Sequence, residues 1–236
     1  MHAARPPPRN PCATMIAPSP HMPRTVSYST GEEIANSITH GLGAAFGVAG
    51  LAVLVTLAAI QGDPLRVVSF SVYGASLVTL YLFSTCYHGV RAPRLKRFFR
   101  VMDHSAIFLF IAGTYTPFTL VSLQGGVGWW LFGVIWGLAA TGILLKLFFT
   151  GRFGILSTIV YVAMGWCVLV AIKPVVAAIP FGCFLWLLVG GLSYTLGLIF
   201  YAAQRLPYNH AVWHVFVMAG SAAHFVAIFL YVLPNR

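Results

Sequence analysis

The sequence contains very few acidic residues and few charged residues of any kind. Only 4 of its 236 residues are Asp or Glu, and all charged residues together make up 8% of the chain. A soluble domain carries about 25%. Hydrophobic residues make up 59% of the sequence. This composition excludes an ordinary soluble domain and predicts a protein that crosses a membrane several times.

Two further absences exclude other classes of protein. The cysteines at positions 12, 86, 167 and 183 have no paired spacing, so they indicate neither a disulfide framework nor a cysteine-ligated zinc site. The last long hydrophobic segment contains no lysine, so it offers no amine for a Schiff base with retinal. A retinal-binding protein is therefore excluded, although the chain has enough hydrophobic segments to resemble one.

Long hydrophobic runs fill most of the chain after Ser29. Lipid cannot satisfy the hydrogen bonds of an exposed backbone, so apolar runs of this length must cross it as helices. We predict an all-α bundle of seven transmembrane helices that occupies residues 29–236. The predicted spans are residues 34–60, 67–89, 103–122, 128–149, 154–173, 180–203 and 209–233.

The first 28 residues differ from the rest of the chain. Residues 1–28 contain 7 of the 14 prolines and no apolar run, so they cannot pack a core of their own. We predict that they form a disordered, proline-rich N-terminal tail.

Basic residues give the chain a net charge of +10 and gather between particular spans. Residues 91–100 carry five of them and no acidic residue, which indicates a cytoplasmic loop. Alternation of the helices then places 11 basic residues on the cytoplasmic side and 3 on the other. This predicts a cytoplasmic N-terminus and a C-terminus outside. We expect membrane lipids, and not nucleic acid, as partners of these residues, and nothing indicates a protein partner.

Two histidines stand four residues apart at the start of the last span. His210 and His214 would share one helix face and could bind one metal ion, although packed histidines could have the same spacing. Under the predicted topology, His88 and Asp103 lie at the same membrane depth as this pair. Chance is a poor explanation for histidines from separate helix ends that share one membrane depth. The pattern therefore favours a Zn²⁺ site with three histidine ligands, His88, His210 and His214, and a fourth position open to water.

Asp103 and Ser84 are the candidate catalytic residues beside that open position. Asp103 could hold or deprotonate a water molecule. Ser84 lies one helical turn from His88 and could donate a hydrogen bond to that water or to an oxyanion. Alternatively, the Ser84 hydroxyl donates back to its own helix, as is common in membrane helices.

A third polar group lies at the start of the first span and comprises Glu33, Asn36 and His40. These residues could orient the zinc ligands, or they could pack the first helix against a neighbour. We favour either role over direct ligation, because three histidines already suffice. His224 lies about 15 Å beyond His214 along a helix axis, too far to reach the same metal, and we predict a structural hydrogen bond for it.

Together these motifs resemble the hemolysin III-type membrane proteins, bacterial relatives of the progestin and adipoQ receptor family. The resemblance covers residues 32–233. It rests on Glu33-Ile-Ala-Asn36-x-x-Thr39-His40, Ser84-x-x-x-His88, Asp103-x-Ser105 and His210-x-x-x-His214. It implies a seven-helix bundle in the bacterial inner (cell) membrane, with zinc held by the three histidines near the cytoplasmic face. Ser84 and Asp103 match positions that approach zinc through water.

The resemblance also implies a function, because the wider superfamily includes ceramidases. It points to a zinc-dependent hydrolase of a lipid amide or ester that acts in membrane lipid homeostasis. One alternative is a non-enzymatic regulator or receptor in which structural zinc clamps the second and seventh helices. The family name suggests a pore-forming hemolysin as a third possibility, but the sequence shows no evident polar channel stripe.

Overall fold

The computed structural model describes residues 28–149 and 154–234. All regular elements in this part of the chain are helical, and seven spans are long and apolar enough to cross a membrane, as predicted. The predicted tail lies outside the described residues, apart from Tyr28. The elements are α1 (Thr30–Ile60), α2 (Pro64–Gly89), α3 (Pro93–Pro117), η1 (Phe118–Ser122), α4 (Gly125–Phe149), α5 (Gly154–Gly165), η2 (Cys167–Ala171), α6 (Ile172–Ala178), α7 (Phe181–Ala202), α8 (Asn209–Ala227) and η3 (Ile228–Val232).

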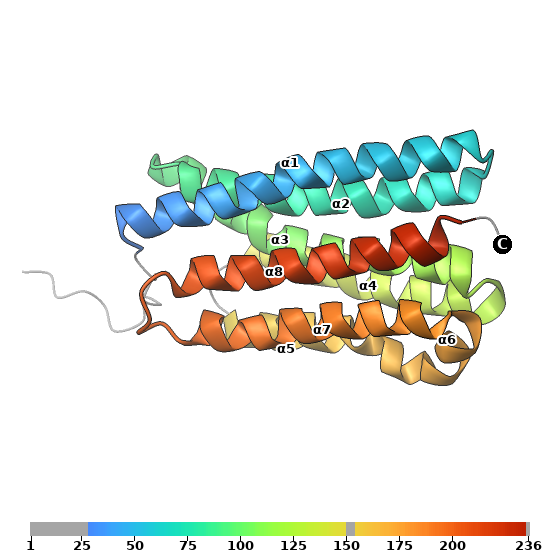
Figure 1. Ribbon diagram of the computed structural model, residues 1–236. Coiled ribbons are helices and arrows are strands. Elements are labelled where there is room, and N and C mark those ends of the chain that lie inside the picture. The colour runs from blue at the N-terminus through green and yellow to red at the C-terminus, as the bar shows by residue number, and fades with distance from the viewer. Residues whose placement is uncertain (1–27, 150–153, 235–236) are drawn as a thin grey trace, which may run out of the picture.

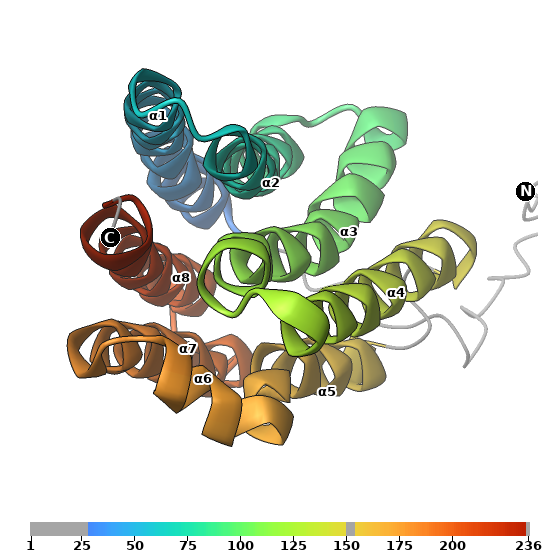
Figure 2. The same ribbon diagram turned by 90° about the vertical axis from the view of Figure 1, so that its right-hand side faces the viewer.

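The seven spans run side by side along one direction (Figure 1). In the end-on view, α2 lies between α1 and α3, and α8 lies between α1 and α7 (Figure 2). α4 packs against α3, and α5 contacts both of them. α1 therefore contacts both α2 and α8, the two helices that carry the predicted zinc ligands.

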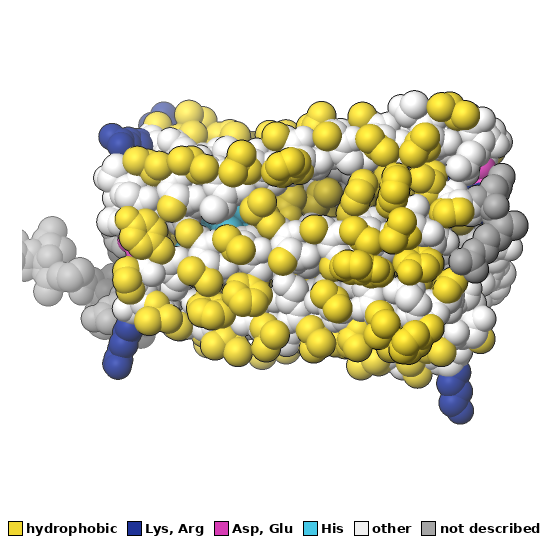
Figure 3. Space-filling model, in the orientation of Figure 1, with side chains coloured by type: hydrophobic (Ala, Val, Ile, Leu, Met, Phe, Trp, Pro, Cys, Tyr) yellow, Lys and Arg dark blue, Asp and Glu magenta, His cyan; other side chains and the backbone are white. Residues whose placement is uncertain are grey.

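Large apolar side chains cover the outside of the bundle. Phe46, Phe148 and Ile155 are 72%, 77% and 82% exposed. Figure 3 shows apolar side chains along the whole length of this face, with Lys and Arg at its two ends. Such a surface would be unfavourable in water and suits the hydrocarbon core of a bilayer, so the fold is that of an integral membrane protein.

The third span begins earlier than predicted. Its first helix starts at Pro93 instead of at residue 103, so much of the expected loop is helical. Proline favours the first turn of a helix, and the Leu, Lys and Arg residues that follow are good helix formers. Hydropathy detects only the apolar part of such a helix, which is why the basic turns were predicted as loop. The first and fifth spans also extend beyond their predicted bounds, to Thr30 and Ala178.

A capping box fixes the start of α1. The backbone amide of Glu32 donates to Ser29 Oγ at 3.3 Å, and the Ser29 amide donates to the Glu32 carboxylate at 2.8 Å. The other oxygen of this carboxylate accepts a hydrogen bond from the backbone amide of Tyr208 at 3.1 Å. Tyr208 has a left-handed backbone (φ 56°) and directly precedes α8. Glu32 therefore ties the start of α1 to the start of α8, where His210 lies.

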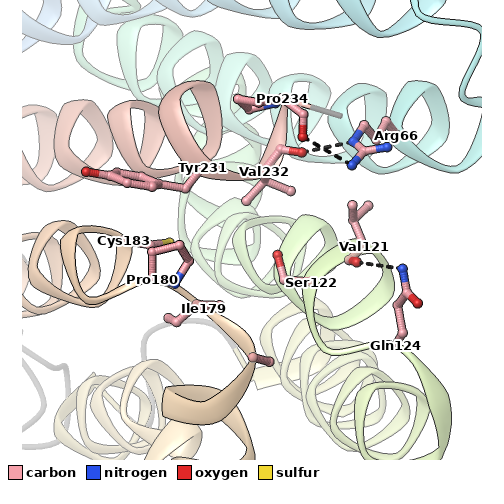
Figure 4. A pocket seen from close by; sticks show the side chains of 11 residues that line it. Arg66, Val121, Ser122, Gln124, Ile179, Pro180, Cys183, Tyr231, Val232 and Pro234 are labelled. Carbon is pink, nitrogen blue, oxygen red and sulfur yellow. Dashed lines mark hydrogen bonds between the residues drawn. The ribbon is translucent and has the colours of Figure 1, made fainter. Parts of the chain in front are cut away.

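Arg66 fastens the opposite end of the bundle. Its side chain pairs with Asp63 and donates to the backbone oxygens of Val232 at 2.9 Å and Pro234 at 3.4 Å (Figure 4). The hydrogen bond from the Arg66 backbone amide lowers the pKa of Asp63, which keeps this carboxylate charged. Arg66 also lines a cavity of about 180 Å³. These bonds join α2 to the π-helical turn η3 at the end of the chain.

Candidate metal centre

The structure brings together the three histidines that the sequence nominates as ligands. His88 lies near the end of α2, and His210 and His214 lie on the first turns of α8. Each offers one ring nitrogen, and these atoms all lie within 4.8 Å of one another. The three residues therefore form a cluster that could hold one metal ion.

Hydrogen bonds at Nδ1 fix which nitrogen of two histidines is available. His88 Nδ1 lies 2.6 Å from the Glu33 carboxylate, and His214 Nδ1 lies 3.2 Å from the backbone oxygen of Asn36. Both partners can only accept, so each Nδ1 must carry the proton and each Nε2 keeps its lone pair. His88 Nε2 is buried and has no hydrogen-bond partner. A buried lone pair of this kind costs free energy unless something binds it, so the donor set fits a metal ion.

The third ligand, His210, is oriented by Tyr28. The Tyr28 hydroxyl lies 3.0 Å from His210 Nδ1, and the tyrosine ring packs against the rings of His210 and His88. Burial raises the pKa of Tyr28 above its usual range, so the hydroxyl stays neutral and can act as donor or acceptor. All three histidines thus have a partner at Nδ1.

The three α1 residues, Glu33, Asn36 and His40, all adjoin the cluster. Glu33 holds His88, and Asn36 holds His214 through its backbone while its side-chain amide lies 3.4 Å from His88 Nδ1. His40 behaves differently: its ring stacks on His214 with 3.4 Å between centroids, and neither of its ring nitrogens has a hydrogen-bond partner. His40 therefore packs against His214 and does not form a hydrogen bond with it.

Ser84 and Asp103 meet beside the histidines. Both residues line the same cavity, and the Ser84 hydroxyl lies close enough to the Asp103 carboxylate to interact with it. Its neighbour Thr85 shows the alternative arrangement, because its hydroxyl donates to the Tyr81 oxygen of its own helix at 2.7 Å. Asp103 does not belong to the group of ligand atoms formed by the three histidines. This placement is compatible with the predicted role beside a metal ligand set.

A cavity of about 400 Å³ adjoins the cluster. His210 and His214 line it together with Ser84 and Asp103, and apolar residues cover most of its remaining wall. This volume lies in the range of small-molecule sites. His224 also lines the cavity and makes the structural hydrogen bond predicted for it, with Nε2 3.2 Å from the Leu187 oxygen.

Comparison with known proteins identifies a family for this chain. The sequence model of the family described as Haemolysin-III related matches residues 28–225. The chain belongs to the haemolysin-III related family. The resemblance seen in its motifs is thereby confirmed.

Relatives of this haemolysin-III related protein are found in bacteria and in mammals. It is 49% identical to Hemolysin-3 of Bacillus cereus over 204 residues, which cover 86% of this chain and 93% of that protein. It is 44% identical to the Hemolysin-3 homolog of Bacillus subtilis (strain 168) over 204 residues, with coverage of 86% and 96%. It is 27% identical to the human Monocyte to macrophage differentiation factor over 209 residues, with coverage of 85% and 84%.

Several residues around the candidate centre of this haemolysin-III related protein were not predicted from the sequence. Tyr28 was assigned to the end of the tail but contacts two of the histidines, and it is the first residue that the family model matches. Lys96 was assigned to a loop but lies on α3, and its Nζ donates to the Glu33 carboxylate at 2.6 Å. The Thr39 hydroxyl lies 3.1 Å from His214 Nδ1. Of these, only Thr39 stands in a motif that could have indicated it.

Proposed function

We propose that this protein is a zinc-dependent hydrolase that cleaves an amide or ester bond of a membrane lipid. The observation that carries the proposal is the position of the Ser84–Asp103 pair, which lines the same apolar cavity as His210 and His214. Three histidines, a carboxylate beside them and an apolar cavity together match what hydrolysis of a lipid requires.

Zinc would be held by His88, His210 and His214, and when bound it lowers the pKa of a water molecule and polarises a carbonyl group. Glu33 and Asn36 keep the His88 and His214 rings in the orientation that presents Nε2. Asp103 accepts a proton from the attacking water at its carboxylate. Ser84 lines the cavity together with Asp103, and its hydroxyl can donate its single hydrogen to the carbonyl oxygen as negative charge develops there.

The cavity supplies the binding part of the proposed reaction. Its apolar wall accepts the hydrocarbon part of a lipid, while the polar side chains near the histidines keep the cleavable bond at one end. Exclusion of water along the wall strengthens the electrostatic interactions of Asp103 with the reacting atoms.

The proposed hydrolysis can be tested with purified protein in neutral lipid nanodiscs. Zinc-loaded protein would be offered ceramides, other acyl amides and acyl esters, with release of fatty acid measured by mass spectrometry. We expect turnover with at least one class and none after removal of zinc by a chelator. A protein that keeps one zinc ion per chain and turns over no member of the panel would contradict the proposal.

The same contacts favour a second candidate function, in which zinc is purely structural. α8 packs mainly on α7 and α1, so a metal ion shared by His88 on α2 and the α8 histidines would add a direct link between these helices. A regulator or receptor of this kind would lose its fold, and not merely an activity, when a ligand is removed. Thermal unfolding of a ligand variant distinguishes the two functions.

Glu33 offers a direct test of how the zinc ligands are held. We expect Glu33→Gln to weaken zinc binding by about 10–100-fold, because a neutral amide supports the His88 ring less well than a carboxylate does. Zinc affinity would be measured by competition with a chelator. Glu32→Gln is the matched control, since Glu32 caps α1 and forms no hydrogen bond with any of the three candidate ligands. Equal zinc affinity in both variants would contradict the assigned role of Glu33.

The distribution of basic residues supports a location in the bacterial cell membrane with the metal centre on the cytoplasmic side. Five basic residues lie between residues 91 and 100, at the end of the bundle where α1 and α8 begin, whereas Arg66 and Lys173 lie at the other end. Single cysteines introduced at Arg94 and Lys173 should react with a membrane-impermeant maleimide from the inside and the outside respectively. The reverse pattern of labelling would refute this orientation.

A further inference from the structure

Two basic side chains from different helices line the same cavity as the candidate metal centre. Arg100 lies on α3 and Lys146 lies on α4, and the two are close enough to interact electrostatically. Lys146 is only 6% exposed. A lysine that simply extended towards the lipid headgroups would leave its charged end accessible to water. The structure instead holds Lys146 in the wall of the cavity.

The charges around this cavity are mainly positive. All four acidic residues of the chain are described, and only Asp103 lines the cavity, as Ser84 also does. With histidines counted as neutral, Arg100, Lys146 and Asp103 give the wall a net charge of +1. A bound zinc ion would make the site still more positive. Like charges repel strongly where the dielectric constant is low, so the site favours an anionic ligand.

Much of the remaining cavity wall is apolar. Ile107, Phe110 and Ile111 line it from α3, and Leu198 and Val217 line it from α7 and α8. A ligand that satisfies both regions carries a negative charge at one end and a hydrocarbon chain at the other. A free anion would leave the apolar wall uncovered, and a neutral lipid would not be attracted by the positive charges of Arg100 and Lys146.

We propose that Arg100 and Lys146 bind the phosphate headgroup of a single-chain lipid, whose hydrocarbon chain occupies the apolar part of the cavity. Two basic side chains match a phosphate monoester, which carries a charge of about −1.5 to −2 near neutral pH. The inference rests on the proposed function, because it names anionic lipids as the substrate class of the same site. It predicts that the protein discriminates between lipids by headgroup charge.

Dodecyl phosphate and dodecylphosphocholine provide a matched pair of probes. They have the same chain, but only the first has a net negative charge, and neither contains an amide or a carboxylic ester. Binding to zinc-loaded protein in neutral nanodiscs would be measured by calorimetry, below the micelle concentrations, with empty nanodiscs subtracted. We expect dodecyl phosphate to bind at least about tenfold more tightly than either dodecylphosphocholine or inorganic phosphate.

Charge-neutralising variants locate the headgroup. Arg100→Gln and Lys146→Gln should each weaken dodecyl phosphate binding by about tenfold or more at unchanged zinc content, and leave dodecylphosphocholine unaffected. Arg97→Gln removes an exposed charge from the same helix and should change neither affinity. Lys146→Arg keeps the charge and should retain binding, which covers the case in which Lys146→Gln does not fold.

Three results would overturn the inference: equal affinity for the two amphiphiles, unchanged affinity in Arg100→Gln, or equally tight binding of inorganic phosphate. The last of these would indicate a site for a free anion. Because the probes have no acyl bond, binding is measured independently of hydrolysis. Selective binding without turnover of any lipid would support the headgroup site while refuting the hydrolase, and turnover of neutral lipids without selective binding would do the opposite.

Discussion

Replacing any one of the three histidines with alanine is expected to remove most of the bound zinc. Wild-type protein should contain about one ion per chain, and His88→Ala, His210→Ala and His214→Ala should each contain a small fraction of that. The reason is geometric: the three ligand atoms lie within 4.8 Å of one another, and two ligands cannot complete the tetrahedral set of a zinc site. Metal content per chain, measured by inductively coupled plasma mass spectrometry, checks this.

His224→Gln is the matched control for that experiment. His224 lies on the same helix as His210 and His214, but its ring binds the Leu187 oxygen and takes no part in the cluster. Glutamine keeps a donor for that oxygen, so zinc content should remain at the wild-type level. Stoichiometric zinc in all three alanine variants would refute the assignment. A large fall in melting temperature that accompanies zinc loss would favour the structural role of the metal over the catalytic one.

Asp103→Asn is expected to lower the rate of lipid hydrolysis by about 10²–10⁴-fold while leaving zinc content unchanged. An amide has nearly the same shape as a carboxylate and its oxygen can still accept a hydrogen bond, so the local packing should survive, but it cannot take a proton from water near neutral pH. The loss should therefore appear in kcat much more than in zinc binding. Single-turnover measurements with the best substrate of the amide and ester panel would measure it.

Asp63→Asn is the corresponding control. Asp63 is the carboxylate that pairs with Arg66 at the opposite end of the bundle, and it lies outside the cavity of the candidate centre. Its replacement should affect stability and leave kcat close to the wild-type value. An Asp103→Asn protein with full activity would exclude Asp103 as the general base, even if the zinc assignment stands.

The sequence could predict those residues of the site that are unusual within a membrane span, namely the histidines. Seven apolar segments define the fold, and histidines within such segments stand out because their burial needs a partner. The alternation of the spans then predicts that His88, His210 and His214 lie at one membrane depth. This prediction does not depend on their side-chain conformations. The structure agrees with both the number of spans and the convergence of the histidines.

The partners of these histidines could not be predicted in the same way. Lys96 sits in a basic first turn that hydropathy does not distinguish from a loop, although it contacts Glu33. Tyr28 follows a proline-rich stretch and gives no periodic signal of its own. The π-helical turns η1 and η3 were also missed, because they depend on how a helix end is packed and not on a recognisable local motif.

The candidate metal centre combines residues from nearly opposite ends of the sequence, since 182 positions separate Tyr28 from His210. Protein chains are synthesised and fold from the N-terminus onward. His88 therefore enters the membrane well before the α8 histidines have been translated. A nascent chain that stops before Asn209 possesses one of the three imidazoles, so the three-histidine cluster can be complete only once the last helix has been inserted.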